Sequence, residues 1–125
     1  MKAVRLKTEY LNNPIGIDIQ HPRIFWNCEG GVKQTAYRIV TGKWDSGKVE
    51  SAGMRAEYPL PLSSRERVEY TVTLWDENGV EGDPSTAFFE TGLLNKSDWS
   101  AKWIRGDYKV SKKRRYPVDY FCNTF

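Results

Sequence analysis

The sequence contains little cysteine and histidine, and this scarcity excludes several kinds of protein. Two cysteines, Cys28 and Cys122, stand far apart in 125 residues. An immunoglobulin-type disulfide needs a second cysteine on the strand near Val72, and none is there. We therefore expect two free thiols and a reducing, cytoplasmic setting. The one histidine, His21, precedes Pro22, and neither cysteine has a ligand neighbour at zinc-finger spacing, so we expect no metal and no cofactor.

Long apolar runs and a strong excess of one charge are also missing. Charged residues interrupt the apolar ones near the N-terminus, so we expect no secretory signal and no membrane partner. A net charge of +3 is too small to indicate a nucleic-acid partner. The basic run 112–115 is either a nucleic-acid or heparin patch or a solvated linker, and we favour the linker because no aromatic residues interleave it.

Alternation of apolar and polar residues is the dominant pattern in the chain. Val68, Tyr70, Val72 and Leu74 alternate with polar neighbours before the turn 76–79, which predicts a central strand with one buried face. Similar segments predict further strands at 4–10, 24–28, 37–42, near 49, at 54–60 and at 86–91. The chain is thus predicted to be all-β, an immunoglobulin or fibronectin type III-like antiparallel sandwich of about seven strands with a C-terminal extension.

The composition changes after Gly92, where strand alternation is lost and the aromatic residues become irregularly spaced. We therefore expect a sandwich domain over residues 1–94. Residues 95–125 are expected to be a linker and the truncated start of a following β domain. We also expect that residues 105–125 permit self-association, because an extended aromatic segment without strand partners tends to find them in another molecule.

Seven segments occur in the order seen at the N-terminus of bacterial α-L-rhamnosidases, which this chain therefore resembles. They are NPIGID (13–18), HPRIFW (21–26), QTAYRIV (34–40), WDSGKVES (44–51), TLWDENG (73–79), FETGLL (89–94) and DWSAKWI (98–104). The resemblance implies a fibronectin-like first domain, followed in such enzymes by further β-sandwich domains and by an (α/α)-barrel with the active site. It implies that the parent enzyme is an inverting glycoside hydrolase, whose two catalytic carboxyl groups lie on the barrel.

Carboxylates in this chain are better explained as turn formers than as catalytic groups, because Asp and Asn favour turns through local hydrogen bonds. They lie in turns or at strand ends, at Asp18, Asp45, Glu50, Asp76 and Glu77. We assign no catalytic residue and expect no enzymatic activity from this fragment.

Four tryptophans are the candidate functional residues. Trp75 faces outward by alternation, and Trp44, Trp99 and Trp103 lie in irregular segments, so several of these rings are expected to be partly exposed. The favoured interpretation is that they pack against downstream domains of the same parent chain. The alternative is a carbohydrate-binding module that stacks exposed Trp and Tyr rings on glycans.

Overall fold

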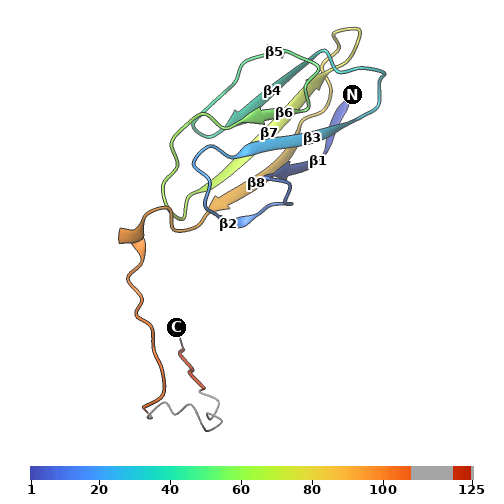
Figure 1. Cartoon of the computed structure of the whole chain (residues 1–125). Helices are drawn as coiled ribbons and strands as arrows, with labels where there is room; N and C mark the ends of the chain where they lie inside the picture. The colour runs from blue at the N-terminus through green and yellow to red at the C-terminus, as the bar shows by residue number, and fades with distance from the viewer. Residues whose placement is uncertain (108–119, 125) are drawn as a thin grey trace.

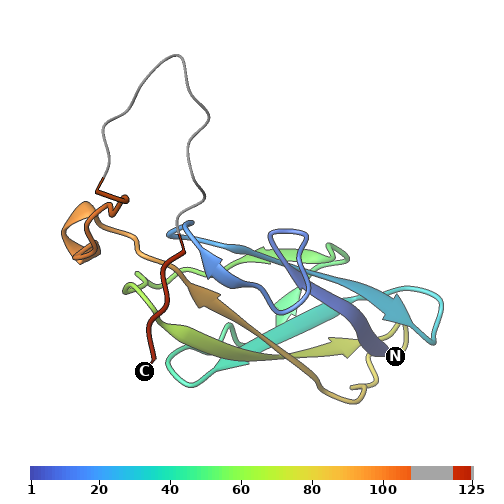
Figure 2. The ribbon, with the colours of Figure 1, turned by 90° about the horizontal axis from the view of Figure 1, so that it is seen from below.

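The computed structural model describes residues 1–107 and 120–124, and its regular secondary structure is almost entirely β-strand (Figure 1). The elements are β1 (Lys2–Thr8), β2 (Ile15–Ile17), β3 (Arg23–Glu29), β4 (Ala36–Thr41), β5 (Val49–Glu50), β6 (Arg55–Glu57), β7 (Arg67–Trp75), β8 (Ser85–Thr91) and the short 3₁₀ helix η1 (Lys96–Asp98). Three strands form one sheet in the order β1-β3-β6, and five form the other in the order β2-β8-β7-β4-β5. Figure 2 shows the sheets as two stacked layers, which confirms the predicted sandwich.

Strand β7 is the centre of the five-stranded sheet, as its alternation predicts. It pairs antiparallel with β4 on one side and with β8 on the other. Val68, Tyr70, Val72 and Leu74 are all buried, while their polar neighbours face outward. Because it has a partner on both sides and one buried face, β7 is the strand around which the core is built.

Strand β1 corrects the predicted set of inward-facing residues at 4–10. Its register with β3 shifts between Val4 and Lys7, so that Ala3 instead of Val4 is buried at the start of the strand, whereas Thr8 is buried and Leu6 packs against the core as the alternation predicts. A bulge of this kind adds a residue to one strand and reverses the alternation beyond it. Tyr10, the last residue of the strand predicted at 4–10, lies outside β1 and is exposed.

Strand β2 is an element that the sequence pattern missed, and it makes the sheet mixed rather than purely antiparallel. Ile15 and Ile17 pair in parallel with the end of β8. Pro14 and a glycine in the left-handed region, Gly16 at φ +84°, hid this strand among turn signals. Within the described residues the sandwich therefore has eight strands, where about seven were predicted.

The core joins the two sheets through aromatic rings and a few polar contacts. Tyr58 meets Phe89 edge-on at 5.7 Å, and Phe89 packs on Tyr70 at 6.3 Å between ring centroids. The Tyr70 hydroxyl lies 3.2 Å from the Thr8 hydroxyl of β1, in the opposite sheet. This contact links the two layers of the sandwich.

Candidate functional site

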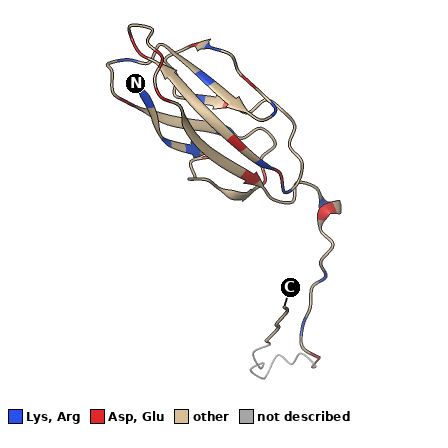
Figure 3. Ribbon diagram, turned by 180° about the vertical axis from the view of Figure 1, so that it is seen from behind, with Lys and Arg blue, Asp and Glu red and all other residues tan. Residues whose placement is uncertain are grey.

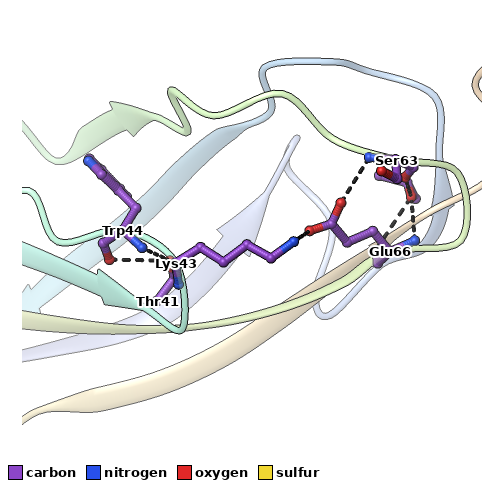
Figure 4. A network of polar contacts seen from close by, with 6 residues as sticks. Thr41, Lys43, Trp44, Ser63 and Glu66 are labelled. Carbon is purple, nitrogen blue, oxygen red and sulfur yellow. Dashed lines mark hydrogen bonds and ion pairs between the residues drawn. The ribbon is translucent and has the colours of Figure 1, made fainter.

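The chain leaves β8 at one end of the sandwich (Figure 1), and a set of hydrogen bonds closes this end. Thr91, the last residue of β8, is buried, and its hydroxyl donates to the Ser63 carbonyl at 2.6 Å. The same oxygen accepts the Glu66 N–H at 2.8 Å. The Glu66 carboxylate in turn accepts the Ser63 N–H at 2.8 Å and the Lys43 ammonium at 2.6 Å (Figure 4). The loop that precedes β7 is thus tied both to the exit of β8 and to the loop that follows β4.

Ser64 fastens the first residues beyond the sandwich. Its hydroxyl oxygen accepts the Leu94 N–H at 2.8 Å, and the hydroxyl also hydrogen-bonds to the Asp98 carboxylate. Asp98 accepts the Asn95 N–H at 3.1 Å as well. These bonds, that from Ser64 first, lower the pKa of Asp98. We call this arrangement the exit clamp, consisting of Ser64, Leu94, Asn95 and Asp98. The proposed domain boundary at residue 94 stays a prediction.

Beyond the exit clamp the chain carries large exposed apolar side chains. Trp99 is 58% exposed, Trp103 is 96% exposed, and Ile104 is also exposed. Residues 99–107 run away from the sandwich (Figure 1). Large exposed rings of this kind make the segment a candidate contact surface. The basic run 112–115 lies outside the described residues.

The other two candidate tryptophans lie in the sandwich. Trp44 is half-buried and meets Tyr58 edge-on at 5.8 Å. Trp75 is only 8% exposed, so the expectation of a partly exposed outward ring is wrong. Its cross-strand partner is the small, fully buried Ala36, and the Lys48 ammonium lies 5.2 Å from the ring centroid. A ring that points outward from the sheet can therefore still be covered, here with the Lys48 side chain over it.

A cleft with a volume of about 380 Å³ opens beside the exit clamp. Its lining comes from the end of β4 and the loop after it, from the residue that follows β6, and from the start of β7 with the residue before it. The lining residues are Thr41, Gly42, Lys43, Tyr58, Glu66, Arg67, Val68 and Glu69. The ion pair of Lys43 and Glu66 lies within it, and hydrogen bonding between the two lowers the pKa of Glu66 and raises that of Lys43. Acidic and basic residues alternate along this part of the ribbon (Figure 3). The cleft therefore combines an ion pair with apolar surface.

Three of the five carboxylates predicted to form turns, Asp45, Asp76 and Glu77, accept backbone N–H groups, whereas Glu50 lies in β5. Asp45 accepts a backbone N–H of its own turn and pairs with Arg38, contacts that lower its pKa to about 2. Asp76 accepts two backbone N–H groups, from Asn78 and Val80, at 2.9 Å each. Glu77 accepts two others from the β3–β4 loop. Among the described residues, no group of three or more possible ligands forms a metal site.

An aromatic platform on the outer face of the three-stranded sheet escaped the sequence reasoning. The Tyr10 ring stacks on Phe25 at 4.5 Å, and the Arg23 guanidinium lies 5.5 Å from the Tyr10 centroid. Arg23 also makes a two-pronged ion pair with Glu9. Glu9 and Tyr10 both have positive φ, the pattern of a type I′ turn, in which glycine or asparagine is usual. Without those residues, the turn had no sequence signal.

Two sheets with this topology, followed by a clamped and aromatic segment, define an immunoglobulin-like β-sandwich domain. In the described part of the chain, no helix is long and apolar enough to cross a membrane. Residues 3–95 match the family model of the Rha78A-like, N-terminal immunoglobulin domain. The chain belongs to this family, and the resemblance drawn from the sequence segments is confirmed.

Known relatives are much longer than this chain. The α-L-rhamnosidase of Streptomyces avermitilis is 36% identical over 123 aligned residues, which cover 83% of this chain and 12% of that protein. The solved α-L-rhamnosidase from Dictyoglumus thermophilum superposes with a TM-score of 0.75 at 32% identity, over 84% of this chain and 14% of that one. The fibronectin(III)-like modules of Clostridium thermocellum CbhA, at 10% identity, 72% and 99% coverage and a TM-score of 0.50, share the fold alone.

Proposed function

We propose that this chain is the N-terminal, non-catalytic packing module of an α-L-rhamnosidase, an inverting glycoside hydrolase that removes terminal α-L-rhamnose from glycosides. The observation that carries the proposal is the match to a stretch amounting to 12% of an α-L-rhamnosidase, within the family of N-terminal immunoglobulin domains. Chains of that length have room for the catalytic domain elsewhere. The carboxylates named above support the same view, because turns and ion pairs already engage them.

The exit end of the sandwich supports a packing role. The exit clamp fixes the direction of the chain as far as Asp98, and the exposed rings of Trp99 and Trp103 follow at once. A fixed direction followed by exposed rings is suited to holding one domain against the next. The two thiols, Cys28 and Cys122, are unpaired, which supports our further proposal of a cytoplasmic location.

The test is an activity comparison with an aryl α-L-rhamnoside as substrate. The 125-residue chain should release no rhamnose, whereas the polypeptide encoded by the complete reading frame should turn the substrate over. Turnover by the 125-residue chain that survives repurification would overturn the non-catalytic assignment. A complete polypeptide without rhamnosidase activity would overturn the parent activity.

Glycan binding is a second candidate function, favoured by the stacked ring of Tyr10, which is 61% exposed beside Arg23. An exposed ring next to a charged hydrogen-bonding group is suited to a sugar ring and its hydroxyls. Titration of the chain with rhamnosides and polysaccharides, followed by calorimetry, separates the two functions. Binding that Tyr10→Ala abolishes would support the glycan module, and the packing module predicts no heat of binding.

A further inference from the structure

The cleft beside the exit clamp contains an open sheet edge. Strand β4 pairs with β7 from Ala36 opposite Trp75 to Thr41 opposite Tyr70 and then leaves the sheet. Strand β7 continues through residues 67–69, which pair with β8 on their other side. Within the described residues, 67–69 have no partner on the β4 side, and all three line the cleft. Because alternate strand residues direct their N–H and C=O groups to opposite sides, backbone groups of this stretch face the cleft.

An unpaired hydroxyl lies in the same cleft. Tyr58 is only 1% exposed and lines the cleft, and its hydroxyl has no hydrogen-bond partner among the described residues. Every fully buried polar side-chain atom in the described part of the chain does have a partner. The Tyr58 hydroxyl is therefore not fully buried. We infer that solvent reaches it through the cleft that Tyr58 lines. The nearby Lys43 ammonium is already held by Glu66.

The loop that forms one wall of the cleft also directs the chain out of the domain. Glu66 lies in the cleft, and two residues earlier Ser64 holds the exit clamp. The linker therefore starts close to the cleft. Since this chain spans 12% of the length of its Streptomyces relative, most of such a protein is available to occupy it.

We propose that the cleft receives an extended peptide segment of a domain that follows in the parent chain, which adds to the edge of β7 at residues 67–69 and hydrogen-bonds to the Tyr58 hydroxyl. The proposal rests on the proposed packing function and assigns it a surface. Strand addition suits an edge whose backbone groups lack partners. A saccharide suits the cleft less well, because Tyr58 is its one aromatic lining residue and that ring is buried.

Gly42 offers a way to block the cleft without disturbing the sandwich. A Cβ atom added there meets nothing within 4 Å, and its φ lies outside the left-handed region. Gly42→Trp should therefore leave the melting temperature of the 125-residue chain unchanged while filling the cleft. Asn27→Trp, at an exposed position of β3 in the other sheet, is the matched control. Tyr58→Phe removes the hydroxyl alone and tests its hydrogen bond separately.

The measurement is amide hydrogen exchange of residues 67–69, in the 125-residue chain and in the polypeptide of the complete reading frame. The cleft-facing amides should exchange at least about tenfold more slowly in the complete polypeptide. Gly42→Trp should abolish this protection, Tyr58→Phe should reduce it, and Asn27→Trp should leave it intact.

The outcomes separate this proposal from the packing function itself. Equal exchange in the two polypeptides would overturn the cleft proposal and leave a packing module that uses other surfaces. Protection of the same amides by added L-rhamnose in the 125-residue chain would overturn the peptide occupant in favour of a sugar. A reading frame that encodes no further domain would overturn the packing function, and the cleft proposal with it.

Discussion

Gln34 holds a buried tryptophan in place, and its replacement by leucine is a quantitative test of the core. Its amide oxygen accepts the Trp26 indole N–H at 2.9 Å and the Cys28 thiol at 3.3 Å. Its amide nitrogen donates to the carbonyls of Ser51 and Gly53, both at 2.9 Å. Gln34 and Trp26 are both buried. One side chain therefore connects β3 to the segment between β5 and β6.

Gln34→Leu keeps a similar volume and removes all four hydrogen bonds. Each bond contributes about 1 kcal/mol net, so about 4 kcal/mol is lost, including the cost of a buried indole N–H without a partner. Burial of the leucine side chain returns about 1–2 kcal/mol. The net decrease in the free energy of unfolding should be about 2–3 kcal/mol. Trp26→Ala, which leaves a cavity in the core, should cost more, about 3–5 kcal/mol.

Urea unfolding followed by far-ultraviolet circular dichroism measures both changes. Gln34→Leu should lower the midpoint by roughly 1–2 M at an unchanged slope. Gln20→Leu, the same substitution at an exposed position, is the control and should change the free energy of unfolding by less than about 0.5 kcal/mol. A loss below about 1 kcal/mol for either Gln34→Leu or Trp26→Ala would refute the strand register that places Trp26 in the core.

Three further predictions concern the turn, the loop and the exit clamp. The hydrogen bond from Arg23 lowers the pKa of Glu9 below its ordinary 4.5. The stability from this pair is therefore present above pH 4.5 and is lost as the pH falls through the lowered value. In urea unfolding from pH 6 to pH 3, Glu9→Gln should thus lose less stability than the unmodified chain, and an equal loss would contradict this. Arg65 has a φ of +60°, which glycine adopts without strain, so Arg65→Gly should raise the free energy of unfolding by about 0.5 kcal/mol. A lower melting temperature for this variant would contradict the prediction. Ser64→Ala should speed amide exchange across 94–98 with little change in β7, and unaltered exchange would show that the exit clamp does not order the linker.

The strands that the sequence predicted well are those with many long-range partners. Alternation at Val68 to Leu74 matches β7, because a one-residue shift in the register of a strand with two neighbours would expose its whole buried face. The misses lie at the edges. In β1 a bulge changed the phase near Val4, and β2 is held by two pairs to β8. Neither feature follows from local residue types, because both depend on the strand opposite.

Within the candidate site, exposure was predicted correctly only for residues in the segment that lacks strand alternation. Trp99 and Trp103 lie exposed, in a segment where strand alternation ends. The exposure of Trp75 was predicted wrongly, because alternation shows to which face of the sheet a side chain points but not whether other residues cover it. The exit clamp and the cleft are formed by residues more than 20 positions apart, such as Lys43 and Glu66, so their proximity is a result of the fold.

Several groups of this domain that are open to a partner lie where the chain leaves it. The carboxylates of the turns are engaged by backbone N–H groups, and Gln34 uses all its hydrogen-bonding capacity in the interior. The open edge of β7, the Tyr58 hydroxyl and the exposed rings after the exit clamp all lie at or beyond one end. Under the proposed packing function, substitutions there should alter the thermal inactivation of the polypeptide of the complete reading frame and leave its substrate preference unchanged.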